Sequence, residues 1–212
     1  MPSFTRLTFR IAALVAFLGA FAPAHASEPI RILAFGDSIT AGYGLPSAAS
    51  LPVQLQAELK RLGQDVTVRN AGVSGDTTAG GLRRVDFSVR GDTAVCVVAL
   101  GGNDLLTGQE PRLVRANLRK IIARLQAGGM TVVLAGMRAP DQLGGAYAGE
   151  FNAVFRELAR TPGVVSYPNL LDGVATIRSL NQRDGIHPNA AGVKVIARRL
   201  APVVARALAV RR

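Results

Sequence analysis

The sequence predicts a three-layer α/β/α domain, in which helices cover both faces of a five-stranded parallel sheet. Short apolar segments alternate along the chain with longer segments whose apolar residues recur at helical spacing. Such alternation is typical of right-handed βαβ units. The chain has 212 residues, which is enough for one domain of this class. A TIM barrel needs eight βα units and is excluded by this length.

The strands are expected where the apolar runs are short. These runs are residues 32–35, 66–69, 95–100, 131–135 and 164–167. The segment 95–100 is apolar throughout, which predicts a central strand buried on both faces. Five parallel strands in a domain of this size indicate a flavodoxin-like arrangement.

Four helices are expected between and after these strands. Leu51 begins the first apolar face, and Ser50 before it is a suitable N-cap. Pro202 lies within the last helical pattern, where it is expected to kink the helix or to end its first part. The apolar faces are Leu51, Leu55, Leu59 and Leu62; Val114, Leu118, Ile121, Ile122 and Leu125; Phe151, Val154, Phe155 and Leu158; and Val193, Ile196, Ala197, Leu200 and Val204.

The first 26 residues have the pattern of a secretory signal peptide. Arg6 and Arg10 precede the short uncharged stretch 11–21, and Ala24-His25-Ala26 follows it. This order predicts cleavage after Ala26. An uncleaved membrane anchor is the alternative, but the stretch is short for a bilayer. The sequence therefore predicts a signal peptide at 1–26, a single domain at 27–212, and a periplasmic or secreted location.

The charge and the aromatic content of the chain indicate which kinds of binding partner to expect. The formal net charge is +11, and it falls to +9 without Arg6 and Arg10. The arginines are scattered and aromatic residues are few, so nucleic-acid binding is not expected. A solvated basic surface with transient attraction to anionic membranes is expected instead. Cys96, the only cysteine, cannot form a disulfide within the chain, and its apolar segment predicts a buried side chain. Nothing in the sequence predicts an oligomeric state.

Four polar, glycine-containing segments follow predicted strands. They are Gly36-Asp37-Ser38, residues 70–76, Gly101-Gly102-Asn103-Asp104, and Asp184-Gly185-Ile186-His187-Pro188. In an open parallel sheet, the carboxyl ends of the strands lie at one edge, where ligands bind. We therefore expect these segments to meet there.

Three of these residues suggest nucleophilic catalysis. Ser38 is a candidate nucleophile, although a serine after Gly-Asp is also common in turns. A serine needs an adjacent base, and His187 is the only histidine outside residues 1–26. Asp184, three residues earlier, is placed to orient its ring, with a turn or cap role as the alternative. Asp37 is expected to organise the turn before Ser38.

A tetrahedral intermediate also needs hydrogen-bond donors for its oxyanion. The candidates are the backbone N–H groups of Ser38 and Gly75 and the side-chain amide of Asn103. Two of them have structural alternatives, because Gly75 can be a turn glycine and Asn103 can cap a helix. Their joint placement after neighbouring strands favours the functional interpretation.

The four segments together resemble the SGNH hydrolases, the GDSL-type esterases and lipases, over essentially all of residues 27–212. The family's Ser, Gly, Asn and His fall on Ser38, Gly75, Asn103 and His187, and Asp184 completes the triad. The resemblance is greatest to the bacterial periplasmic thioesterase, lysophospholipase and arylesterase group. Ile39 stands where the family motif has leucine. Residues 36–40 do not fit the G-x-S-x-G pattern, which argues against the larger α/β-hydrolase fold.

The resemblance implies hydrolysis of carboxylic esters or thioesters through an acyl-enzyme, with no metal and no cofactor. The glycine-rich segment 138–147 is expected to be mobile and to cover an acyl pocket. One alternative is a carbohydrate esterase that removes acetyl groups from polysaccharides. A second is a non-catalytic binding module of flavodoxin type, with flavin binding disfavoured because the first strand is not followed by a Ser/Thr-rich phosphate loop.

Overall fold

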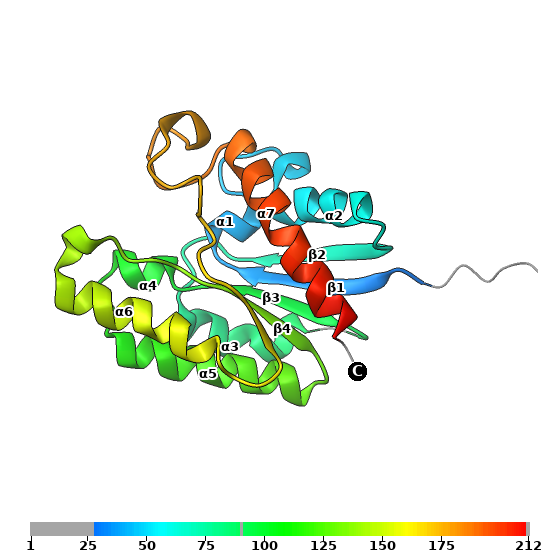
Figure 1. Ribbon diagram of the computed structural model, residues 1–212, viewed down its shortest axis with the longest axis horizontal. Coiled ribbons are helices and arrows are strands. Elements are labelled where there is room, and N and C mark those ends of the chain that lie inside the picture. The colour runs from blue at the N-terminus through cyan, green and yellow to red at the C-terminus, as the bar shows by residue number, and fades with distance from the viewer. Residues whose placement is uncertain (1–27, 90, 211–212) are drawn as a thin grey trace, which may run out of the picture.

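The computed structural model describes residues 28–89 and 91–210 and contains one parallel sheet (Figure 1). The order of its five strands is β2-β1-β3-β4-β5, the flavodoxin-like order. The strands are β1 (Ile30–Gly36), β2 (Val66–Gly72), β3 (Val95–Ala99), β4 (Thr131–Ala135) and β5 (Val164–Tyr167). The prediction of a three-layer α/β/α fold with five parallel strands is confirmed. The expected signal peptide lies outside the described residues.

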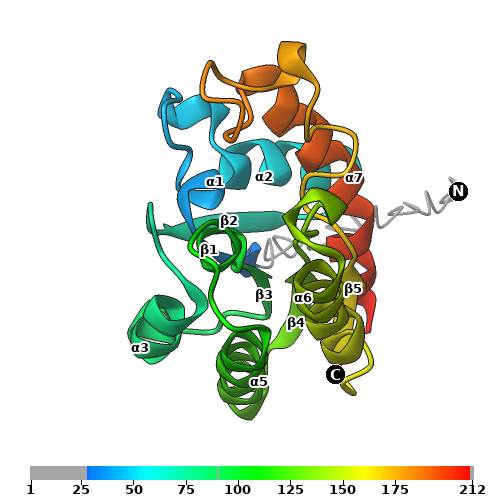
Figure 2. The same ribbon diagram turned by 90° about the vertical axis from the view of Figure 1, so that its left-hand side faces the viewer.

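Helices form a layer on each side of the sheet (Figure 2). The helices α2 (Leu51–Arg61) and α7 (Ala190–Ala209) pack together on one side. On the other side lie α3 (Thr78–Ser88), α5 (Pro111–Ala127) and α6 (Gly145–Leu158). Two short helices, α1 (Ser38–Ala41) and α4 (Gly102–Leu106), directly follow strands β1 and β3. Single turns of 3-10 helix occur at Ser47–Ala49, Asp141–Leu143 and Arg178–Leu180.

The core is apolar and is centred on β3, whose five residues are all buried. Cys96 lies within this strand, and burial raises the pKa of its thiol, so the thiolate does not form readily. The prediction that Cys96 acts as a buried small hydrophobe is confirmed. Helix α5 buries the apolar face expected from its sequence, including Val114, Leu118 and Ile121.

Three details of the helices differ from expectation. Helix α3 was not predicted, because Gly80 and Gly81 interrupt its apolar pattern. Helix α7 continues through Pro202 to Ala209, because buried residues on both sides of the proline hold it against the core. Ser50 occupies the N-cap position of α2, but its side chain makes no capping hydrogen bond.

Among the described residues, no helix is both long enough and apolar enough to cross a bilayer. The connections that follow β1, β2, β3 and β5 all emerge at the carboxyl edge of the parallel sheet. This edge carries the polar segments singled out in the sequence.

Candidate active site

Ser38 lies at the junction between strand β1 and helix α1. Asp37 caps this helix, and its Oδ1 accepts a hydrogen bond of 3.0 Å from the Ile39 N–H. A side chain at Gly36 would collide with Thr40 and the carbonyl oxygen of Ala99, so only glycine allows this sharp exit from the strand. The prediction that Asp37 organises the turn is confirmed. Ser38 is largely buried, at 8% exposure, and lies at the edge of the sheet.

His187 joins Ser38 to Asp184. The Nε2 atom of His187 lies 3.0 Å from Ser38 Oγ, and its Nδ1 atom lies 2.7 Å from Asp184 Oδ2. The other carboxylate oxygen of Asp184 accepts hydrogen bonds from the N–H groups of Ile186 and His187, at 2.9 and 3.0 Å. Asp184 therefore both shapes the turn and contacts the ring. A proton on Nδ1 leaves Nε2 free to accept from the serine hydroxyl.

The loop that carries Asp184 and His187 is fastened at its base. Gln182 N–H donates to the carbonyl oxygen of His187 at 2.8 Å. The side chain of Gln182 donates to the carbonyl oxygen of Tyr43 at 2.8 Å, which ties the loop to the segment after α1. The Tyr43 ring lies 4.7 Å from the His187 ring, centroid to centroid. Asn189 then caps helix α7 through hydrogen bonds from Ala191 and Gly192.

The pKa values of Asp184 and of the neighbouring Asp37 are shifted in opposite directions. The hydrogen bonds from His187 and Ile186 lower the pKa of Asp184 to about 2, so it is a carboxylate at neutral pH. Burial raises the pKa of Asp37 to about 6, against the lowering effect of the Ile39 hydrogen bond. Asp184 thus supplies a permanent negative charge behind the imidazole, whereas Asp37 serves as a helix cap.

The candidate oxyanion donors come from three neighbouring segments. Gly75 has a φ of +81°, a conformation that favours glycine, in the loop between β2 and α3. Asn103 Nδ2 donates to the backbone carbonyl oxygen of Asp76 at 2.9 Å, which leaves its second amide hydrogen for another acceptor. Among the described residues, no hydrogen bond is made by the N–H of Ser38 or of Gly75.

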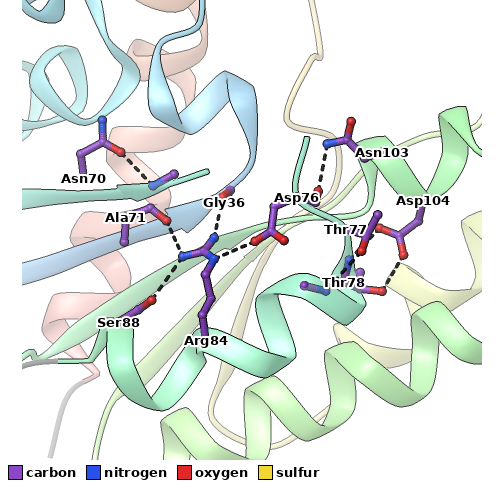
Figure 3. A network of polar contacts seen from close by, with 12 residues as sticks. Gly36, Asn70, Ala71, Asp76, Thr77, Thr78, Arg84, Ser88, Asn103 and Asp104 are labelled. Carbon is purple, nitrogen blue, oxygen red and sulfur yellow. Dashed lines mark hydrogen bonds and ion pairs between the residues drawn. The ribbon is translucent and has the colours of Figure 1, made fainter. Parts of the chain in front are cut away.

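Asp104, a buried acid to which the sequence analysis gave no role, holds the first residue of helix α3 after this loop. Asp104 is 2% exposed and accepts hydrogen bonds from the N–H and the hydroxyl of Thr78, at 2.8 and 2.6 Å (Figure 3). Asn117 also donates to the Thr78 hydroxyl, at 3.1 Å. The place of Asp104 in the polar segment 101–104, next to Asn103, was the sequence signal for it, but nothing in the sequence indicated its contact with Thr78.

A largely apolar cavity of about 340 Å³ opens beside Ser38. Ser38, Asn103 and His187 line it, and Gly75 is not among its lining residues. The apolar wall comes from residues of several loops and short helices, including Ile39, Leu105, Leu106, Met137, Pro140, Leu171, Ala175 and Ile186. A cavity with this lining accommodates an acyl chain or an aryl ring.

The glycine-rich segment expected to cover the pocket is only partly a loop. Arg138 and Pro140 line the cavity, as expected of a neighbouring segment. Residues from Gly145 onward belong to helix α6, and Tyr147 donates a hydrogen bond of 3.0 Å to the carbonyl oxygen of Gln109. Helix α6 thus begins at Gly145, six residues before the apolar face from which a helix was predicted, and the mobility of the segment stays a prediction.

No group of three or more potential metal ligands occurs among the described His, Cys, Asp and Glu side chains. The absence of a metal or cofactor from the reaction stays a prediction.

A flavodoxin-like three-layer sheet with a serine after its first strand, in contact with a histidine that itself contacts an aspartate, is an arrangement typical of serine hydrolases. Residues 34–195 match the GDSL-like Lipase/Acylhydrolase family. The chain belongs to this family, the SGNH hydrolases, and is an ester hydrolase.

Curated relatives and solved structures agree with this assignment. The chain is 37% identical to an arylesterase of Vibrio mimicus over 84% of this chain and 89% of the relative. It is 32% identical to thioesterase 1/protease 1/lysophospholipase L1 of Escherichia coli K12, covering 78% of each. The crystal structure of TesA superposes with a TM-score of 0.78 at 34% identity, covering 84% of this chain and 99% of TesA. AlinE4, an SGNH-hydrolase family esterase, gives 0.72 at 42% identity, covering 85% and 97%.

Proposed function

We propose that the enzyme hydrolyses carboxylic esters and thioesters through an acyl-enzyme on Ser38, with His187 as general base and Asp184 as its orienting acid. The contact that carries the proposal is the continuous path from Ser38 Oγ through His187 to Asp184, with separations of 3.0 and 2.7 Å. A base at hydrogen-bonding distance from a serine, itself held by a third group, is the arrangement that activates a hydroxyl nucleophile.

In the first half of the reaction, Ser38 Oγ attacks the acyl carbonyl carbon and transfers its proton to His187 Nε2. The carbonyl oxygen becomes an oxyanion, for which the N–H groups of Ser38 and Gly75 and the amide of Asn103 are the proposed donors. His187 then gives the proton to the departing alcohol or thiol as the tetrahedral intermediate collapses.

In the second half, His187 takes a proton from water, which attacks the Ser38 ester. Collapse of the second intermediate releases the carboxylic acid and returns the proton to Ser38. The Asp184 carboxylate stabilises the imidazolium that forms in each half, and its lowered pKa of about 2 keeps it ionised while it does so.

The substrate class follows from the cavity and from the named relatives. The wall beside Ser38 is mainly apolar, which suits acyl chains and aryl groups better than polysaccharide. The relatives named arylesterase and thioesterase 1/protease 1/lysophospholipase L1 suggest aryl esters, acyl thioesters and lysophospholipids. A series of p-nitrophenyl esters from acetate to dodecanoate, run beside acetylated xylan, tests this assignment. Turnover confined to xylan would favour the carbohydrate esterase.

The decisive test of the mechanism is Ser38→Ala. We expect the variant to fold and to lose p-nitrophenyl butyrate hydrolysis by more than about 10³-fold. A fluorophosphonate should label the wild type at Ser38 and leave the variant unlabelled. Ser74→Ala is the matched control, because Ser74 is exposed in the loop beside Gly75 and should keep both activity and labelling. Retained turnover in Ser38→Ala would overturn the assignment.

We also propose that the enzyme is exported to the periplasm or beyond, with cleavage after Ala26. The support is the order of Arg6, Arg10, the apolar stretch 11–21 and the Ala24-His25-Ala26 site. The intact mass of protein recovered from a cell envelope fraction tests this, since a chain that still carries residues 1–26 would contradict it.

A further inference from the structure

Arg84 is the centre of a hydrogen-bond network beneath the candidate oxyanion site. It projects from helix α3 toward the ends of two strands (Figure 3). Its Nε donates to Asp76 Oδ2 at 2.7 Å, and its Nη2 donates to the carbonyl oxygen of Gly36 at 2.9 Å. Its Nη1 donates to the carbonyl oxygen of Ala71 at 2.8 Å and to Ser88 Oγ at 3.2 Å. One guanidinium thereby binds β1, β2, the loop after β2, and α3.

The surroundings of Arg84 are largely closed to solvent. Its side chain is 20% exposed, and that of Asp76 is 9% exposed. The guanidinium carbon lies 4.2 Å from the centroid of the Phe35 ring, in cation–π geometry. A side chain at Gly80 would come within 1.8 Å of Asp76 Oδ1, so glycine there lets α3 approach the acid. The geometry of the guanidinium is therefore set from several sides.

Two of the four hydrogen-bond partners of Arg84, Gly36 and Asp76, lie close in sequence to candidate oxyanion donors. Gly36 is two residues before Ser38, in the turn that presents its N–H. Asp76 directly follows Gly75, and its carbonyl oxygen accepts the hydrogen bond from Asn103. Arg84 is thus hydrogen-bonded to the turn that contains Ser38 and to Asp76, whose carbonyl oxygen in turn binds Asn103.

We propose that Arg84 is a positioning residue for the oxyanion hole, holding the Ser38 turn and the Gly75–Asp76 loop in register with the Asn103 amide. This inference rests on the proposed function. Arg84 does not touch the substrate; it acts through Gly36 and Asp76. Displacement of a donor by about 1 Å can lower a rate by about 10²-fold, so the geometry of this network governs the chemical step.

The fork of the guanidinium is the property that this role requires. The N–H groups of the planar guanidinium point in fixed directions, so they can donate to acceptors on separate segments. A lysine would keep the positive charge beside Asp76 but is a point charge on a flexible stem. A role limited to neutralising Asp76 would therefore survive Arg84→Lys, whereas a positioning role would not.

The first experiment compares Arg84→Lys with Arg124→Gln. Arg124 also binds α3, at Leu82 and Asp86, but from its exposed side and far from the Asn103 contact. For p-nitrophenyl butyrate, we expect Arg84→Lys to lower kcat by about tenfold with KM changed less than twofold, because the loss falls on the transition state. Arg124→Gln should leave both constants unchanged. Equal kcat in Arg84→Lys and wild type would overturn the proposal.

Partial unfolding must not be mistaken for a catalytic defect. Fluorophosphonate titration counts the competent sites, so kcat is expressed per folded enzyme. Asp76→Asn provides a second variant. It keeps the backbone carbonyl that binds Asn103 and weakens only the interaction between the side chains of residues 76 and 84. A smaller fall in kcat, about threefold at constant KM, is expected. An unchanged kcat in both variants would reject the positioning role even if their stability fell.

A double-mutant cycle with Asn103→Ala separates positioning from a general structural effect. If Arg84 acts through the donor set, the tenfold loss from Arg84→Lys should shrink to less than threefold in the Asn103→Ala background. Fully multiplicative losses would contradict the proposal. These outcomes are distinct from failure of the proposed function, which would show as retained activity in Ser38→Ala.

Discussion

The two halves of the candidate site are built in different ways. The acid–base half lies on an exposed loop, where the side chains of Asp184 and His187 are 36% and 20% exposed. The hydrogen bonds that Asp184 accepts within this loop come from residues two and three positions away. The oxyanion half rests on buried groups that are distant in sequence, such as Asp104 and Thr78, 26 positions apart. The base is therefore oriented locally, whereas the donors are oriented by the tertiary structure. Loss of a contact in the first half should change the rate, and loss of one in the second should also change stability.

The largest effect is expected from Asp184→Asn. The amide cannot stabilise an imidazolium as a carboxylate does, so kcat should fall by about 10³-fold. Unfolding in urea should change by less than about 1 kcal/mol, because the residue is exposed and its contacts are local. A large loss of stability together with the loss of rate would remove the distinction between the two halves.

Asp104→Asn tests the oxyanion half. The amide would place donor hydrogens against the donors of Thr78, so we expect a loss of about 3 kcal/mol in the free energy of unfolding. Asp86→Asn is the matched control, since that acid lies on α3 and pairs with Arg124 at the surface, with 71% side-chain exposure. The control should change stability by less than about 0.5 kcal/mol. Similar losses in the two variants would show that burial is not the deciding factor.

Asp37→Asn tests the acid at the boundary between the two halves. Burial raises the pKa of Asp37 from 3.8 to about 6. Well below pH 3.8 the group is protonated in both folded and unfolded chains, and its effect on stability is constant. As the pH rises from about 4 to 6, only the unfolded chain ionises fully, so stability is lost.

Urea unfolding at pH 4 and pH 7 measures this loss. Asp37→Asn should remove a decrease of about 2 kcal/mol between the two values, while the pH effects of other groups remain. Parallel pH dependence in the wild type and the variant would contradict the raised pKa.

The smallest effect is expected from Gln182→Ala. It removes the hydrogen bond to the carbonyl oxygen of Tyr43 that ties the His187 loop to the segment after α1. Because Asp184 and His187 orient each other, kcat should fall by less than about threefold and stability by less than about 1 kcal/mol. Gln54→Ala removes a similar side-chain bond, to Ala48 at 2.7 Å, away from the site and serves as its control. A loss of kcat near that of Asp184→Asn would mean that the position of His187 depends on the hydrogen bond between Gln182 and Tyr43.

The sheet was predictable because most of its strands are short apolar runs, and β4 and β5 have the expected bounds. Helix α3 was not predictable from its pattern, since Gly80 and Gly81 read as interruptions. In the structure these glycines let the helix approach its neighbours closely, because a Cβ at Gly81 would lie 2.4 Å from the Leu100 side chain. Close approach of a helix to the sheet is a tertiary property that local periodicity does not report.

The same limit applies to the candidate site. The topology of a parallel sheet was enough to predict that Ser38 and His187 would meet, because the ends of strands converge. The hydrogen bonds of Arg84 to Gly36 and of Asp104 to Thr78 join positions 48 and 26 apart. No spacing rule selects these pairs, since they depend on how α3 lies beneath the loops.

The turn that contains Asp184 has a consequence for how such enzymes diversify. Its carboxylate binds the backbone of residues 186 and 187 and the ring of His187, so four consecutive residues carry the geometry of the acid and the base. The connection from β5 to this turn also supplies Leu171 and Ala175 to the cavity wall. Insertions or deletions in that connection would reshape the cavity wall beside Ser38 while the contacts of Asp184 with Ile186 and His187 stay intact. Under the proposed mechanism, substrate selectivity and proton transfer can therefore change independently within this one connection.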